Sequence, residues 1–208
     1  MLLVVGTYRK RAYVQRALTS IRRHVTGVDR IVFVDDSGSA ENAHWLTQFG
    51  EVVETHATGY NAAMQAVCQV IGTEPAMFVE EDFEFISPVD LNDMMTVLHE
   101  HPNLAQIALL RGPVFPIELK HGGLLEGLVA RLGPEFVDLR KEPYGWSQRG
   151  TWTMNPAVWR PGIAAEGWPV GDWSEDLMRD RLRDQGWRFG YLEGIKVRHD
   201  GKRTGRGY

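Results

Sequence analysis

The sequence predicts an α/β fold with a mostly parallel central sheet and helices on both faces. Apolar runs such as Leu2 to Val5 are continuous rather than alternating, as expected for strands covered on both sides. Stretches with apolar side chains at helical spacing separate these runs, so strand and helix alternate through the first half of the chain. The 208 residues suffice for one domain with a large core.

The first half is expected to contain four strands and three helices. The first helix has Val14, Leu18, Ile21 and Val25 at helical spacing, and the second ends at Gly50. The expected strands are 2–5, 30–36, 51–56 and 76–82, and the expected helices are 11–25, 41–50 and 59–72.

The second half shows a different pattern. The most distinct helix is 174–186, with Ser174 as N-cap, acids in its first turn and Gly186 at its end. Alternation in "RGTWTMN" predicts a strand over 149–155, and Pro156 is expected to open a short helix. Further expected elements are a helix at 89–101, an amphipathic stretch at 121–133, and strands at 104–110, 187–194 and 195–199.

Composition excludes several classes of protein. The net charge of -4 argues against a protein that coats nucleic acid. Cys68 is the only cysteine, so neither an internal disulfide nor a cysteine-based zinc site is possible. No apolar run approaches the roughly 20 residues of a membrane span. The start "MLLVVGTYRKR" is apolar first and basic second, the reverse of a signal peptide, so a cytoplasmic location is expected.

Polar side chains follow four of the predicted strands. Carboxyl ends of parallel strands meet at one edge of an open sheet, where ligands bind. We therefore expect these groups to converge. They are Thr7, Tyr8 and Arg9; Asp35 and Asp36; Glu80, Glu81 and Asp82; and His199.

The acids at 80–82 are the most informative group. Clustered carboxylates stay ionised together when a cation holds them, and carboxylate oxygens favour Mg²⁺ or Mn²⁺. The alternative is an exposed acidic turn, against which the preceding buried strand argues. His199, more often a surface or core residue when considered alone, could complete the coordination of a metal held by Asp82.

The other polar groups leave two interpretations open. Asp35 and Asp36 either cap the following helix in an Asx-turn or accept hydrogen bonds from a nucleotide base or ribose. Arg9 belongs either to a solvated charge run or to a nucleotide pocket, near phosphate or base. Glu175 and Asp176 lie in the first turn of a helix, where acids are favoured in any case.

In this order the motifs resemble the GT-A-fold glycosyltransferases, especially family 2. The matching pieces span nearly the whole chain. They are Thr7-Tyr8-Arg9, Val34-Asp35-Asp36-Ser37, Gly59 and Asn61, Glu80-Glu81-Asp82, Glu175-Asp176, Gly186 and His199. Glu80 departs from the pattern, because the family usually has Asp at the first position of its D-x-D motif.

The resemblance implies a metal-dependent, inverting sugar transfer from a nucleotide-diphosphate sugar. Asp82 and His199 would bind Mn²⁺ or Mg²⁺, and Asp176 would be the general base, with Glu175 as second choice. The donor would contact Thr7, Tyr8, Arg9, Asp35, Asp36, Asn61, Glu80, Glu81, Lys202 and Arg203, with Asp35 binding the base and Asp36 assisting. Trp152, Trp168 and Trp173 are expected on the acceptor side. The single domain, 1–208, would comprise a nucleotide-binding half (1–86), an acceptor-side half (87–199) and a mobile basic tail (200–208).

Rival functions fit the sequence less well. A nucleotidyltransferase or a dehydrogenase would carry a glycine-rich loop after the first strand, and "GTYRKR" lacks one. A nucleotide-sugar-binding protein without transfer need not keep Asp82, Asp176 and His199 together. The acceptor stays open between a saccharide, a protein, a lipid and a modified nucleobase, and residues 111–135 match no known pattern.

Overall fold

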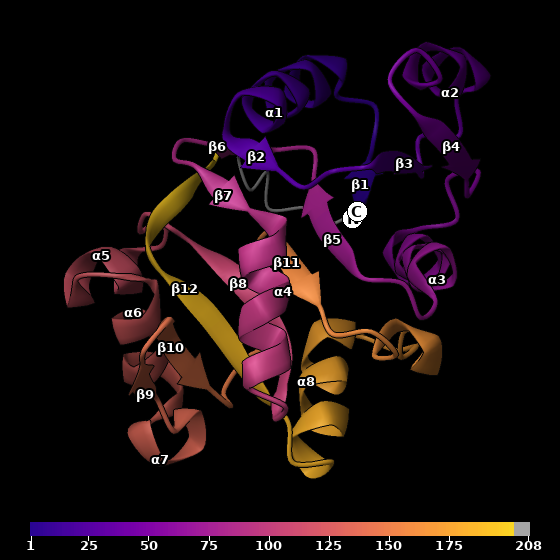
Figure 1. The fold of residues 1–208 in the computed structure, drawn as a ribbon. Helices are drawn as coiled ribbons and strands as arrows, with labels where there is room; N and C mark the ends of the chain where they lie inside the picture. The colour runs from indigo at the N-terminus through magenta and orange to yellow at the C-terminus, as the bar shows by residue number, and fades with distance from the viewer. Residues whose placement is uncertain (202–208) are drawn as a thin grey trace.

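The computed structural model describes residues 1–201, and a ten-stranded sheet forms the centre of this part of the chain (Figure 1). Its strands are β1 (Leu2–Thr7), β3 (Arg30–Asp35), β4 (Glu51–Glu54), β5 (Ala76–Glu80), β6 (Phe83–Phe85), β8 (Leu104–Arg111), β9 (Arg140–Glu142), β10 (Gly145–Gln148), β11 (Ala157–Trp159) and β12 (Arg188–His199). A separate parallel pair joins β2 (Val25–Thr26) to β7 (Val89–Asp90).

The strand order is β4-β3-β1-β5-β11-β8-β12-β10-β9, and β6 pairs with β12. Strands β4, β3, β1 and β5 are mutually parallel, and β8 is parallel to β12. The short β11 lies antiparallel between β5 and β8 and joins the two parallel groups. The predicted α/β fold with a mostly parallel sheet is therefore confirmed.

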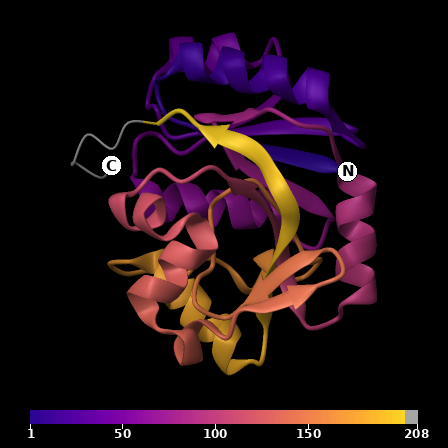
Figure 2. The same ribbon diagram turned by 90° about the vertical axis from the view of Figure 1, so that its left-hand side faces the viewer.

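Helices cover both faces of the sheet. On one face, α1 (Arg11–His24) and α4 (Leu91–Glu100) pack their apolar sides against the sheet, and α3 (Tyr60–Ile71) and α8 (Ser174–Asp184) do so on the other. Figure 2 shows the sheet between α1 and α8. The remaining helices are α2 (Ala40–Leu46), α5 (Pro116–His121), α6 (Leu124–Leu132), α7 (Pro134–Val137) and the 3-10 turn η1 (Ala164–Glu166). None of the helices in residues 1–201 has both the length and the apolar character needed to cross a membrane.

Several predicted elements of the second half were wrong. Residues 149–155 form no strand, because the Gln148 side chain accepts hydrogen bonds from the backbone of Gly150 and Thr151 and fixes a local turn. The short helix expected at Pro156 is absent, and β11 starts directly after this residue. The two predicted strands at 187–199 are one strand, β12, with an irregular register between Tyr191 and Ile195.

Candidate functional site

The strand register brings the predicted polar groups to one edge of the sheet. Thr7 at the end of β1 pairs with Asp35 at the end of β3, and Gly6 pairs with Glu80 at the end of β5. On the other side, His199 at the end of β12 pairs with Phe83 of β6, directly after Asp82. Groups more than 190 residues apart in sequence thus share one edge of the sheet.

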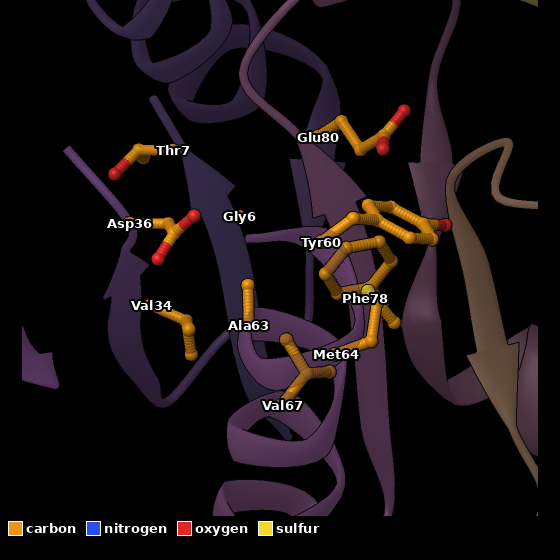
Figure 3. A pocket seen from close by; sticks show the side chains of 10 residues that line it. All are labelled: Gly6, Thr7, Val34, Asp36, Tyr60, Ala63, Met64, Val67, Phe78 and Glu80. Atoms are coloured by element: carbon orange, nitrogen blue, oxygen red, sulfur yellow. The ribbon is translucent and has the colours of Figure 1, made fainter. Parts of the chain in front are cut away.

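A small pocket opens between β1, β3, β5 and the start of α3. In Figure 3, Asp36 and Thr7 lie on one side of it, and Glu80 and the Tyr60 ring lie on the other. Its volume is about 20 Å³, room for one water molecule, so it can form only the floor of a larger ligand site. The lining residues are Gly6, Thr7, Val34, Asp36, Tyr60, Ala63, Met64, Val67, Phe78 and Glu80.

The two aspartates after β3 occupy different environments. Both are buried, but different groups bind them: the Asp35 carboxylate accepts hydrogen bonds from the Thr7 hydroxyl, Ser37 and Asn42. This is the turn-forming role that the sequence left open. Asp36 lines the pocket, and its carboxylate accepts hydrogen bonds from the backbone N–H groups of Thr58 (3.0 Å) and Gly59 (3.1 Å). Asp36 is therefore the better placed of the two to reach a ligand, the reverse of the order that the resemblance implies.

Glu80 and Glu81 both have raised pKa values. Burial raises the pKa of Glu80 well above its usual range, and the charges of Asp82, Glu175 and Glu81 raise it further. Burial also raises the pKa of Glu81 to about 8, although its carboxylate accepts a hydrogen bond from the Tyr8 backbone. Negative charge at this edge is thus costly unless a cation offsets it.

Asp82 and His199 meet across the end of the sheet, with His199 Nε2 3.3 Å from Asp82 Oδ2. Asp82 Oδ1 is buried and has no hydrogen-bond partner among residues 1–201. Gly201 packs over both groups, since a Cβ built there would lie 2.0 Å from Asp82 Oδ2. The described residues contain no group of three or more His, Cys, Asp or Glu side chains able to hold a metal. The unpartnered oxygen and the imidazole fit a divalent ion that takes its other ligands from elsewhere.

The turn after β1 is held by its own contacts. Arg9 has a left-handed backbone (φ 59°), and its Nε donates to the Ser37 carbonyl at 2.7 Å. The Arg9 guanidinium also lies 5.2 Å from the centre of the Tyr8 ring. Tyr8 and Arg9 therefore lie beside the β3 turn, at the edge where the sequence places them.

The two acids that open α8 point in different directions. Glu175 accepts a hydrogen bond from the Tyr60 hydroxyl at 3.0 Å, and its charge acts on Glu80. Asp176 is about half exposed and forms an ion pair with Arg179 one turn along the helix. The structure thus brings Glu175, rather than Asp176, to the pocket.

The remaining predicted residues are scattered. Trp152, within the irregular segment 149–156, and Trp168, after it, are core residues, because the rings of both pack onto Trp159. They cannot line an open acceptor surface. Trp173 is 82% exposed, and Asn61 donates to the Gly171 carbonyl near it. Lys202 and Arg203 lie outside the described residues.

Sequence reasoning missed Tyr60 and Gly201 as parts of the site. Tyr60 is the first residue of α3, and its ring contacts Trp168 edge-on at 6.2 Å. The only available indication was its position after Gly59, at the start of a helix that follows a strand. Nothing in the sequence indicated that Gly201 belongs to the site, since its role depends on the close approach of two distant strand ends.

Comparison with solved structures shows a GT-A-like glycosyltransferase fold. The mannosyltransferase PcManGT from Pyrobaculum calidifontis, solved with GDP-Man and Mn²⁺, matches 98% of this chain with a TM-score of 0.68 at 13% identity. S. aureus TarS, residues 1–349, matches 95% of it with a TM-score of 0.63 at 14% identity. The chain covers only 57% and 59% of these two structures. No protein-family model and no curated protein matches the sequence.

Proposed function

We propose that this protein transfers a sugar from a nucleotide-diphosphate sugar to an acceptor hydroxyl. The observation that carries the proposal is the convergence of Asp36, Glu80, Asp82, His199 and Glu175 at one edge of a GT-A-like sheet. The mannosyltransferase with this fold was solved with GDP-Man and Mn²⁺, which makes GDP-mannose a suitable first donor to test.

The nucleotide would lie over the small pocket. Asp36 lines it, and Thr7 and Arg9 stand at the turns beside it. Within the part of the chain that the structure describes, one oxygen of Asp36 accepts a single hydrogen bond, from the Gly59 N–H, and so retains a lone pair for a base or ribose donor. Glu80, on the opposite side, would face the sugar-phosphate end.

Asp82 and His199 would hold Mn²⁺ or Mg²⁺ together with the donor diphosphate and water. The bound ion would offset the charge that develops on the leaving diphosphate. The negative charge of Glu80 and Glu81, which burial disfavours, would also be stabilised by it. Gly201 would leave the space that the ion needs beside Asp82, because any side chain there would fill it.

A carboxylate at the start of α8 would take the proton from the acceptor hydroxyl. Glu175 is favoured by its contact with Tyr60 at the pocket, and Asp176 would first have to leave Arg179. Attack by the deprotonated oxygen on the face of the sugar opposite the diphosphate would invert the anomeric carbon.

A thermal-shift screen tests donor binding. Nucleoside diphosphates and their sugars, with and without Mn²⁺, should raise the melting temperature, because ligands that bind only the folded state stabilise it. We expect a shift for at least one nucleotide sugar that is larger with Mn²⁺. No shift with any nucleotide sugar would contradict the proposal, whereas a shift without turnover would indicate binding alone.

A further inference from the structure

The loop before α8 presents a strained and exposed tryptophan. Trp173 has a left-handed backbone (φ 57°, ψ 43°), is 82% exposed and makes no side-chain capping bond to α8. A bulky residue in this conformation is a true outlier. Its backbone strain would be relieved by another residue, above all by glycine. Exposure means that packing does not explain the choice of tryptophan, and a residue that is both strained and unpacked points to ligand contact.

The loop is anchored rather than loose. Asn61 donates to the Gly171 carbonyl at 3.1 Å, and the Trp168 backbone N–H donates to the Gln65 side chain at 2.9 Å. Inside the protein, the Trp168 ring stacks on Trp159 with an interplanar angle of 16°. The loop that carries Trp173, two residues before Glu175, is therefore held in place by α3 and the core.

The charges around Trp173 limit the ligand it can take. Asp172, Glu175 and Asp176 lie within three residues of it, and no Lys or Arg occurs between Trp168 and Met178. Asp176 is paired with Arg179, which leaves Asp172 and Glu175 as the acids beside Trp173 without an ion pair to Arg179. This acidic rim repels phosphate groups and anionic lipid headgroups. A flat aromatic face beside carboxylates suits a neutral sugar, whose C–H face packs on the ring and whose hydroxyls donate to the acids.

We infer that Trp173 is the platform of an acceptor subsite for a neutral saccharide. That the bound saccharide is an acceptor rests on the proposed function. Binding of a sugar at Trp173 is nevertheless measurable without turnover. Among the acceptors that the sequence leaves open, it selects the saccharide and disfavours a lipid or a nucleic acid.

The test compares Trp173→Gly and Trp173→Phe with wild type in the full chain. The probes are the methyl glycosides of glucose, galactose, mannose and N-acetylglucosamine, observed by saturation-transfer NMR. Trp173→Gly should weaken glycoside binding about tenfold or more, and Trp173→Phe less, because the stacking face is lost or reduced. The melting temperature of Trp173→Gly should stay at or above that of wild type, since glycine accepts the positive φ.

Ala57→Gly is the matched control. Ala57 is also exposed with φ 57°, so its replacement relieves the same backbone strain without removing a ring. It should leave glycoside binding unchanged. The inference is overturned if wild type binds none of the glycosides, if Trp173→Gly binds them equally well, or if this variant melts at a lower temperature than wild type. It is also overturned if wild type, but not Trp173→Gly, binds vesicles of anionic phospholipid. Glycoside binding through Trp173 without turnover of any nucleotide sugar would instead reject only the proposed transfer.

Discussion

The hydroxyl of Tyr60 donates a hydrogen bond to the Glu175 carboxylate at 3.0 Å and so joins the start of α3 to the start of α8. Asp36 binds the N–H groups of Thr58 and Gly59 just before Tyr60. The side of the pocket proposed for the nucleotide is therefore physically connected to the proposed base.

Tyr60→Phe tests this connection. Loss of the hydrogen bond should lower kcat about tenfold, within the range for a bond to a charged group, and leave the KM for the donor unchanged. Steady-state kinetics with GDP-mannose and Mn²⁺ separate the two constants. Tyr144→Phe, in the turn between β9 and β10, is the control. An equal loss in both variants would remove Tyr60 from the site.

Glu175→Gln and Asp176→Asn together identify the base. If Glu175 is the base, Glu175→Gln should lower turnover by roughly 100-fold or more, within the range of general-base losses. Asp176→Asn should lose only its exposed ion pair with Arg179, worth about 0.3–0.5 kcal/mol of stability. Turnover and melting temperature measured on both proteins decide the matter, and the reverse pattern would assign the base to Asp176.

Asp36→Asn and Asp35→Asn should affect different properties. Asp36→Asn should weaken nucleoside diphosphate binding by about 1–3 kcal/mol, the usual effect of losing a charged acceptor. Asp35→Asn should mainly lower the free energy of unfolding, because both oxygens of Asp35 already accept hydrogen bonds from Thr7, Ser37 and Asn42 and Asp35 does not line the pocket. Calorimetric titration and urea denaturation measure the two effects. Weaker binding only in Asp35→Asn would reverse the assignment.

The buried ion pair between Arg111 and Glu118 should contribute strongly to stability. Both side chains are under 10% exposed, and Arg111 donates two hydrogen bonds to the carboxylate, at 2.8 and 2.9 Å. Glu118→Gln should cost about 3 kcal/mol, since it leaves a buried charge unpaired. Glu41→Gln, which breaks an exposed pair with Arg11, should cost under about 1 kcal/mol. Equal losses in urea denaturation would contradict this difference.

The same pair gives a pH dependence. Burial acts to raise the pKa of Glu118, but hydrogen bonds from Arg111, Val114 and Phe115 outweigh it and lower the pKa. A carboxyl whose pKa is lower in the folded state stabilises the protein above its unfolded pKa, about 4.3. This contribution is lost as the pH falls through the folded pKa. Wild type should therefore lose more stability than Glu118→Gln on acidification below about pH 4, and parallel losses would argue against it.

The sheet and its polar edge could be predicted from sequence because local patterns specify them. The run of apolar residues that ends in Glu80 indicates a buried strand that ends at the polar edge of the sheet. The strand predicted around Trp152 was wrong because the apolar alternation there resembles that of a strand, whereas the side chain of Gln148 holds the backbone in a turn. Local alternation does not reveal such a side-chain bond.

The geometry of the site depends on contacts between distant residues. Asp35 and Asp36 are equivalent in sequence, and only the packing of α2 and α3 shows which one lines the pocket. Glu175 and Asp176 are likewise distinguished by Tyr60, 115 residues earlier. Single-sequence patterns carry no information on these pairings.

Metal-dependent release of the sugar from GDP-mannose or another nucleotide sugar is the most direct test of the central claim. Wild type with Mn²⁺ should release nucleoside diphosphate, and a chelator should abolish the release. Asp82→Asn should fold normally, bind Mn²⁺ and the nucleoside diphosphate much more weakly, and be inactive, because the side chain whose Oδ2 faces His199 and whose Oδ1 is buried no longer carries a charge. Release at the wild-type rate by Asp82→Asn, or the same rate with and without chelator, would contradict the account.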